Sequence, residues 1–396
     1  MVAPHVAALR AFVPEPSADD PLHQPGNWLT ESKIANPMSH WVEFRASRAS
    51  WGLGAIGPVL VEVETSDGHV GVAPSVGGIP AAYIAERHLS RFVEGKPLSI
   101  EGIAEAWEQM FRASLYYGRR GLTLHAISAV DLALWDALGR SRGQPVWSLL
   151  GRKVADAVPV YATTPRPDIA RQLGFVGGKL PLPAGPADGA EGFKDNVAVA
   201  ERMRARCGDP EDFFLAVDCY MALDVAYAAD LIEALAPLEY RWLEEALPPD
   251  DYWGYAEIRR LARGKILAAT GEHEATRWGF RLLLEMGCAD IIQPDVLWCG
   301  GLTELTRIAD IASEHKAVLV PHASSVYAYH FLASRPEPSL AEFVMVQPTG
   351  NEIVPVLAPL LVNEPLPERG YVHVGDEPGF GVEENPDIAL LRPYPH

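Results

Sequence analysis

The fold is decided by a stretch with five short apolar runs, each ending in ionisable residues: DFFLAVD (212–218), YRWLEE (240–245), ILAATGE (266–272), ADIIQPD (289–295) and AVLVPH (317–322). Segments of helical character lie between most of them, such as VAYAADLIEALAP (225–237) and LTELTRIADIASEHK (302–316). Successive runs begin 23 to 28 residues apart. Near-continuous apolar strands that alternate with helices are typical of a parallel sheet buried on both faces.

Three further runs extend this pattern outward: VPVYAT (158–163), FVGGKLP (175–181) and AEFVMV (341–346). Together they give eight strands that alternate with helices. Eight such units are the number found in a (β/α)₈ TIM-type barrel, so the sequence predicts an α/β fold of this class. An open, doubly wound sheet is the alternative, but nothing in the spacing of the runs suggests a break.

The first 150 residues have a different, mixed pattern. LRAFVPE (9–15) and VLVEVETSDGHVGVAPS (59–75) alternate apolar and polar residues and predict antiparallel strands with a hairpin. The segment 127–138 has the periodicity of a helix, and residues 16–50 are expected to form a long loop. The Pro-rich segment after residue 360 must either pack back against the N-terminal region or hang free.

The overall composition excludes several classes of function. The chain has 396 residues and a formal net charge of −19, which makes it a poor partner for nucleic acid. It has four cysteines without CxxC spacing, so we expect reduced thiols rather than disulfides or a zinc site. The N-terminus does not resemble a secretory signal, and no run of about 18 apolar residues predicts a membrane span. We therefore expect a cytoplasmic protein that has no membrane partner.

Three of the predicted strand ends carry carboxylates: Asp218, Glu244 and Glu272. The C-terminal ends of barrel strands face the active site, so these acids should meet at one mouth. Three like charges at close range repel one another strongly unless a cation lies between them. Oxygen ligands favour a hard divalent ion, and the pattern therefore predicts Mg²⁺. Helix capping or ion pairing could explain any one of the acids, but explains all three poorly.

Two neighbouring strand ends carry Asp295 and His322. A carboxylate that accepts a hydrogen bond from one ring nitrogen fixes the tautomer and raises the basicity of the other nitrogen. The pair thus predicts a general base, although His322 alone could also be a satisfied core histidine. A metal that binds a substrate carboxylate could stabilise the enediolate formed when the α-proton leaves, and loss of a β-hydroxyl would then give a 2-keto-3-deoxy acid.

These residues resemble the enolase superfamily, in the subgroup with a His–Asp dyad. ESKIANPMS (31–39), SAVDLALWDALG (128–139), QPDVLWCGGLTEL (293–305), VPHASSVYAYH (320–330) and EPGFGVEEN (377–385) are similar to L-rhamnonate dehydratases in particular. The resemblance implies an α+β capping domain over residues 1–150, a barrel over 151–360, and a segment 361–396 that completes the cap. It also implies Mg²⁺ on Asp218, Glu244 and Glu272, and a base formed by His322 and Asp295.

The resemblance implies further site residues. His23 and Arg48 are similar to the family's substrate contacts, although LHQPGNW around His23 departs from the family pattern by a short deletion. Glu342 resembles an acid that hydrogen-bonds the enediolate and would have to be protonated to do so. Lys179 either contacts a carboxylate or pairs with an acid. His273 is either a proton donor or a wall residue.

Many relatives carry a second base in a Lys-x-Lys pair, but here the run is Lys179-Leu180-Pro181. Racemisation needs bases on both faces of the substrate, so dehydration is favoured. The resemblance implies dehydration of an acid sugar, L-rhamnonate or a relative such as L-mannonate or L-lyxonate; a non-catalytic metal-binding paralogue is the remaining alternative. It also implies a dimer-based homo-oligomer, up to an octamer.

Overall fold

The computed structural model describes residues 4–15, 26–335 and 340–395. Its N-terminal part contains a four-stranded antiparallel sheet in the order β15-β1-β2-β3. The bounds of its strands are Val6–Pro14 for β1, Pro58–Thr65 for β2, Val70–Val76 for β3 and Leu390–Leu391 for β15. The predicted hairpin is β2–β3, in which Pro58 pairs with Val76. The adjoining helices are α2 (Gly78–Tyr83), α3 (Ile100–Ser114), α4 (Leu122–Arg142) and α5 (Val146–Leu150).

Helix α4 joins this sheet to the rest of the molecule. It packs on β2 and β3 on one side and on α11 on another. Gly71 of β3 permits the close contact, because a Cβ there would lie 2.2 Å from the backbone nitrogen of Ala137. By length and composition α4 could cross a membrane, but 89% of its most apolar window is buried inside the protein. Burial of this kind identifies it as a core helix.

Eight parallel strands form the second part, in the order β10-β9-β8-β7-β6-β5-β4-β11. β11 pairs with β4, so the last strand returns to the first, as a barrel requires. Their bounds are Ala157–Thr163 (β4), Gly177–Pro181 (β5), Phe214–Asp218 (β6), Tyr240–Glu244 (β7), Leu267–Thr270 (β8), Ile291–Ile292 (β9), Val318–Leu319 (β10) and Ala341–Val344 (β11). The sheet is thus the predicted TIM-type barrel rather than an open doubly wound sheet.

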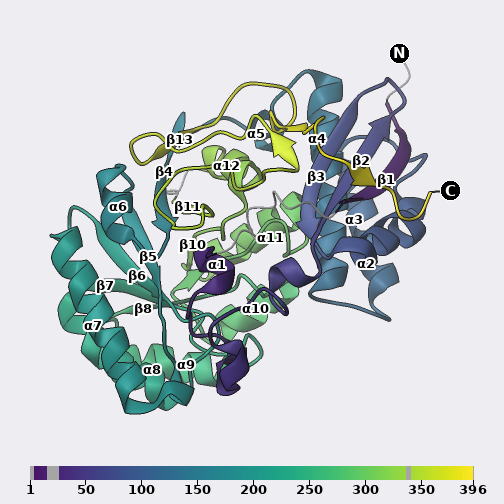
Figure 1. The fold of residues 1–396 in the computed structure, drawn as a ribbon. Coiled ribbons are helices and arrows are strands. Elements are labelled where there is room, and N and C mark those ends of the chain that lie inside the picture. Colours follow the sequence, from purple (N-terminus) through teal and green to yellow (C-terminus); the bar gives the residue numbers. More distant parts are fainter. Residues whose placement is uncertain (1–3, 16–25, 336–339, 396) are drawn as a thin grey trace.

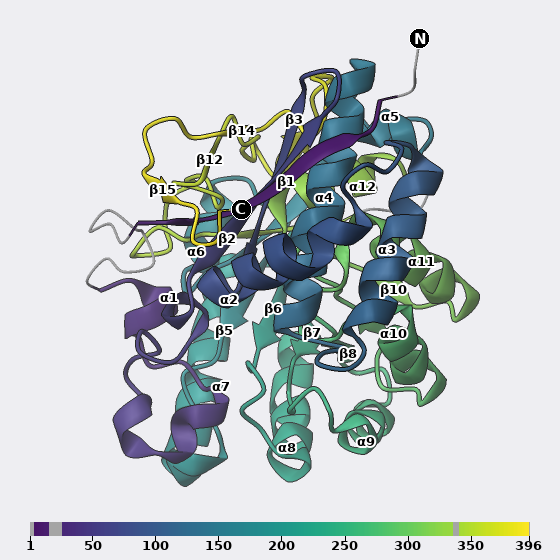
Figure 2. The ribbon, with the colours of Figure 1, turned by 90° about the vertical axis from the view of Figure 1, so that its right-hand side faces the viewer.

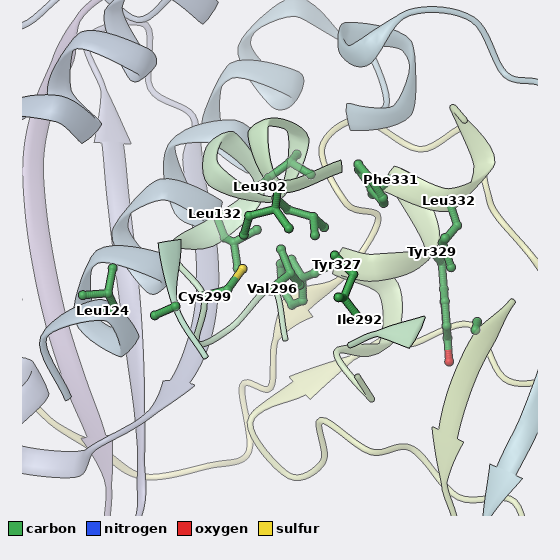
Figure 3. Close-up of a cluster of buried hydrophobic side chains, with 14 of the residues drawn as sticks. Leu124, Leu132, Ile292, Val296, Cys299, Leu302, Tyr327, Tyr329, Phe331 and Leu332 are labelled. Carbon is green, nitrogen blue, oxygen red and sulfur yellow. The ribbon is translucent and has the colours of Figure 1, made fainter. Parts of the chain in front are cut away.

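The helices between these strands pack on the outside of the sheet, as Figures 1 and 2 show in teal and green. Their bounds are Pro167–Gln172 (α6), Gly189–Cys207 (α7), Val225–Leu235 (α8), Tyr252–Ala262 (α9), Thr276–Glu285 (α10), Gly301–Glu314 (α11) and Ser325–Ala333 (α12). Part of the core appears in Figure 3, where Leu132 of α4 lies beside Leu302 of α11 and Cys299. This apolar cluster directly supports the turn that follows β9.

Two segments connect the sheet to the barrel. The C-terminal chain places β12 (Leu361–Val362) against β14 (Glu383–Glu384), β13 (Tyr371–His373) against β4, and β15 against β1. It therefore packs back against the N-terminal sheet rather than hanging free (Figure 1). The region expected to be a long loop contains α1 (Trp28–Glu31) and short 3₁₀ turns at Pro37–His40, Val42–Phe44 and Leu53–Ala55.

The segment around α1 is bonded to the barrel. The indole N–H of Trp28 donates to the carbonyl of Met345 at 2.8 Å, and the amide of Asn27 donates to the carbonyl of Val346 at 3.0 Å. Further along, the backbone N–H of Ala35 donates to the carbonyl of Leu182. These contacts hold residues 27–35 over the C-terminal ends of the strands.

Candidate functional site

A cavity of about 860 Å³ lies between the barrel and the N-terminal sheet. Much of its polar lining comes from the strand ends of the barrel, and its apolar lining comes largely from the sheet, the α1 segment and the C-terminal chain. The polar group comprises Lys179, Asp218, Glu272, Asp295, His322 and Glu342, whereas the apolar group includes Val13, Ile34, Ile56, Ile79, Leu360, Ile388 and Leu391. The predicted strand-end residues therefore meet at one pocket, with the exception of Glu244.

Glu244 lies beneath the cavity rather than on its surface. It is fully buried, and one of its carboxylate oxygens accepts from the indole of Trp242 at 2.9 Å and from the amide of Gln293 at 2.7 Å. Its other oxygen pairs with the ammonium of Lys179. Lys179 also lies 2.8 Å from Glu342 and 3.4 Å from Asp218. Lys179 therefore pairs with acids, and because it also lines the cavity, its expected contact with a substrate carboxylate stays a prediction.

The acids repel one another and are buried. Burial raises the pKa of Glu244, and repulsion by Asp218 raises it further, against the effect of Lys179. Burial also raises the pKa of Glu272, and repulsion from Glu245 and Asp218 adds to this against the two nearby histidines. One ammonium offsets only part of this negative charge.

Glu245 belongs to the same cluster. It follows β7 with a φ of 42°, is 1% exposed, and keeps one buried carboxylate oxygen without a hydrogen-bond partner. Ligand atoms of Glu245, Glu272 and His273 lie within 4.8 Å of one another. Crowded carboxylates that are buried, mutually repelling and in part unpartnered fit a hard divalent cation, because oxygen ligands are what Mg²⁺ prefers. The sequence predicts Asp218, Glu244 and Glu272 as its ligands, and this assignment stays a prediction because the cluster of ligand atoms found here contains Glu245 rather than Glu244.

The imidazole of His322 is oriented by Asp295. Its Nδ1 lies 2.7 Å from one carboxylate oxygen of Asp295, whose other oxygen accepts from the Ser324 hydroxyl and the Leu297 backbone N–H, each at 2.7 Å. This leaves Nε2 of His322 facing the cavity, 3.3 Å from Glu272. Burial lowers the pKa of His322, but Glu272, Glu342 and Asp295 together raise it well above its ordinary value.

The carboxylate of Glu342 lies between cations and hydrogen-bond donors of the protein. Burial does raise its pKa, but the Lys179 ammonium and His322 outweigh that effect and lower it overall. The carboxylate also accepts from the Thr163 hydroxyl, and at 3.2 Å from the backbone N–H of Ala323. Glu342 therefore accepts hydrogen bonds from its protein neighbours, and its expected hydrogen bond to the enediolate stays a prediction.

Arg48 lies on the cavity wall and is 7% exposed. One end of its guanidinium donates to the Leu29 carbonyl, while its Nη1 is buried without a partner. The guanidinium also lies over the ring of Tyr220, 5.8 Å from its centroid. A buried cation with an unused donor at a cavity can bind a carboxylate or a hydroxyl. The other predicted contact of this kind, His23, lies outside the described residues.

His273 lies next to Glu272 and beside these residues, but it is not among those that line the cavity. Its Nδ1 lies 2.8 Å from Glu245 and 3.4 Å from Glu272. Burial lowers its pKa, but these two acids raise it to about 9 overall. Its ring packs at 6.2 Å from that of Tyr220 and at 5.6 Å from that of Trp298.

Two cavity residues, Tyr220 and Trp298, were not identified from the sequence. Tyr220 follows Asp218 with a φ of 42°, and Trp298 follows Asp295 in a turn. Both lie in loops, where an aromatic side chain has no periodic signal. Their closeness to the strand-end acids was the only available indication.

Comparisons with known proteins agree with this geometry. Residues 48–151 match the family described as mandelate racemase / muconate lactonizing enzyme, N-terminal domain, and residues 169–388 match the family described as enolase C-terminal domain-like. An L-rhamnonate dehydratase from Saccharopolyspora erythraea is 53% identical over 370 residues, covering 93% of this chain and 94% of that protein.

Solved structures give the same result. The crystal structure of rhamnonate dehydratase from Gibberella zeae complexed with Mg superposes with a TM-score of 0.92 at 42% identity, covering 98% of this chain and 95% of that one. A racemase from Streptomyces coelicolor with bound magnesium superposes with a TM-score of 0.76 at 26% identity, covering 96% of this chain and 97% of that one.

Proposed function

The chain belongs to the enolase superfamily and, within it, to the L-rhamnonate dehydratase family, and we propose from this premise that it is a Mg²⁺-dependent hydro-lyase that converts L-rhamnonate to 2-keto-3-deoxy-L-rhamnonate. One observation carries the proposal. The Asp295-bound imidazole of His322 presents Nε2 at the same cavity as Glu272, 3.3 Å away. A base therefore lies next to the acids that fit the cation.

The reaction begins when Nε2 of the neutral His322 imidazole removes the proton on C2 of the acid. Glu272, which contributes most to the raised pKa of His322, is one of the acids that would share its charge with the cation. Asp295 holds the ring through Nδ1 and stabilises the imidazolium that forms. When bound, Mg²⁺ supplies positive charge to the substrate carboxylate and to the enediolate. The Lys179 ammonium adds positive charge from the neighbouring strand.

The hydroxyl on C3 then leaves with a proton, so that the substrate loses one water and the resulting enol tautomerises to the 2-keto acid. The protonated His322 can return the proton that it took. His273 is the second candidate donor, because its acid neighbours raise its pKa to about 9 in spite of burial. Arg48 has an unused guanidinium nitrogen at the cavity and would bind the substrate's oxygens.

The cavity's apolar wall favours L-rhamnonate over L-mannonate. L-Rhamnonate ends in a methyl group, whereas L-mannonate has a hydroxyl there. Ile388 and Leu391 of the C-terminal chain and Val13 of β1 form part of this wall. A methyl group gains from apolar burial, and a hydroxyl without a hydrogen-bond partner loses. L-Mannonate and L-lyxonate remain the alternative substrates, and the intact His322–Asp295 pair argues against a non-catalytic metal-binding paralogue.

A screen of aldonates tests the proposal. Each acid is incubated with the protein and Mg²⁺, and keto acid formation is detected with semicarbazide. We expect L-rhamnonate to have the highest kcat/KM and every turnover to stop after chelation. Preference for another aldonate would change the substrate, and Mg²⁺ binding without turnover of any aldonate would favour the non-catalytic paralogue.

Two further properties are proposed with this function. A cytoplasmic location is supported by the four cysteines, which are all free and buried. A dimer-based homo-oligomer is supported by exposed aromatic side chains on α9, α10 and the chain after α3, namely Trp253, Trp278, Tyr116 and Tyr117. Light scattering after size-exclusion chromatography measures the oligomeric state, and a monomer at micromolar concentration would contradict it.

A further inference from the structure

Trp298 lies between the two histidines of the site. Its indole centroid is 5.3 Å from the ring of His322 and 5.6 Å from the ring of His273. A third imidazole, that of His125 from α4, packs at 5.6 Å. Trp298 is 8% exposed, and the cavity is where it is accessible. It therefore presents an apolar aromatic surface next to the imidazoles of the site.

The turn that carries Trp298 also orients the general base. The backbone N–H of Trp298 donates to the Asp295 carbonyl at 2.9 Å, and that of Leu297 donates to the Asp295 carboxylate at 2.7 Å. From the N-terminal sheet, the Ser75 hydroxyl donates to the Leu297 carbonyl at 2.7 Å. Hydrogen bonds within the barrel and from the N-terminal sheet thus hold the turn, and with it the indole, in a fixed position relative to His322. A rigid group at this place can set the position of a ligand.

We propose that Trp298 is a substrate-positioning residue, whose indole packs against the C–H groups of the bound acid and holds C2 at Nε2 of His322. This inference rests on the proposed function, because it assigns the residue to the same cavity and the same reaction. An aromatic face attracts C–H groups that carry partial positive charge, and polyol carbons bear such groups. The indole also fills the space between His273 and His322, which keeps water from separating the base from the substrate.

The test compares two substitutions at this position with one elsewhere. Trp298→Ala removes the surface, Trp298→Phe keeps a smaller aromatic ring, and Trp41→Ala changes a tryptophan that is 50% exposed and does not line the cavity. Each Mg²⁺-loaded variant is assayed with L-rhamnonate for kcat, KM and deuterium incorporation at C2 in D₂O, and its thermal midpoint is recorded.

We expect Trp298→Ala to lower kcat by about 100-fold and Trp298→Phe by about tenfold, because small displacements of a reacting group have effects of this size. KM should change less than kcat, deuterium incorporation should fall with dehydration, and Trp41→Ala should match the wild type. If Trp298→Ala does not fold, the kcat of Trp298→Phe tests the inference instead. If the wild type is active and a folded Trp298 variant has the same kcat, this inference is wrong while the proposed function stands. A wild type that turns over no aldonate overturns the proposed function, and this inference with it.

Discussion

Nδ1 of His322 lies 2.7 Å from a carboxylate oxygen of Asp295, although the two residues are 27 positions apart in the chain. Each follows a two-residue strand, β10 or β9, and these strands are paired in parallel. A second contact supports the pair, because the Ser324 hydroxyl donates to the other oxygen of Asp295. The Asp295 carboxylate is therefore held in place by its own hydrogen bonds, and it in turn orients the imidazole of His322.

Substitution of the base should abolish dehydration without unfolding the protein. We expect His322→Asn to lower kcat by about 10²- to 10⁴-fold, the usual contribution of a general base. Steady-state kinetics with L-rhamnonate measure the loss, and circular dichroism checks the fold. His315→Asn, at an exposed histidine after α11, is the matched control. Turnover retained in a folded His322→Asn variant would remove His322 from this role.

The metal site should depend on particular acids. We expect Asp218→Asn, Glu244→Gln and Glu272→Gln each to weaken Mg²⁺ binding more than tenfold, because each removes one anionic oxygen ligand (an effect of roughly 1.4 kcal/mol or more). Titration calorimetry with Mg²⁺ alone measures this independently of activity.

Glu245→Gln is the informative comparison for these metal variants, since Glu245 is adjacent to Glu244 but bonds His273. It should keep Mg²⁺ affinity near that of the wild type and lower turnover instead. Strong loss of Mg²⁺ binding in Glu245→Gln, with wild-type affinity in Glu244→Gln, would reverse the assignment of the ligand from β7.

Lys179 should be required for stability as well as for activity. It is 1% exposed and pairs with Glu244 and Glu342, so Lys179→Met leaves buried carboxylates without their cation. We expect the free energy of unfolding to fall by about 3–5 kcal/mol, with partial recovery in Mg²⁺. Urea denaturation with and without Mg²⁺ measures both effects. Lys194→Met, which breaks an exposed pair with Glu191, should cost less than about 1 kcal/mol. Equal effects in the two variants would contradict the buried charge network.

His330 should make the fold sensitive to acid. Its Nδ1 accepts from the backbone N–H of Trp147, its ring packs on Phe380 of the C-terminal chain, and burial lowers its pKa to about 3. Because the folded pKa lies below the ordinary value, the neutral ring's contribution is complete above pH 6.5 and is lost as the pH falls toward 3.

At pH 5 this loss should be roughly 2 kcal/mol for the wild type. His330→Gln cannot titrate, so its free energy of unfolding should fall less steeply between pH 7 and pH 5. Urea denaturation across this range measures the two slopes. Equal slopes in the two proteins would contradict the assignment.

The barrel could be predicted because its signal is repeated. Each strand is an apolar run of its own, and the acid or histidine at its end is separated from the next by a nearly constant interval, so Asp218, Glu272, Asp295 and His322 follow directly from the pattern. This pattern cannot show whether a side chain reaches the cavity surface or is buried beneath it. Glu244 occupies an equivalent strand end, yet Trp242, Gln293 and Lys179 hold it beneath the cavity, and these contacts depend on how three strands pack.

Other features were too short to leave a pattern. The helix α1 has four residues, and the strand β15, which places Leu391 at the cavity, has two. A periodicity of 3.6 or 2 residues cannot be recognised in segments of this length. The ion pair between Glu342 and Lys179 was also unpredictable, because it depends on how two side chains from different strands approach each other. Sequence reasoning thus found the residues that end strands and missed those whose roles depend on tertiary contacts.

One measurement tests the central claim most directly: nuclear magnetic resonance of L-rhamnonate incubated with the wild-type protein, first with Mg²⁺ and then after chelation. The account predicts loss of the C2 proton signal and appearance of 2-keto-3-deoxy-L-rhamnonate with Mg²⁺, and an unchanged spectrum after chelation. Unaltered L-rhamnonate in the presence of Mg²⁺, or equal product formation after chelation, would contradict it.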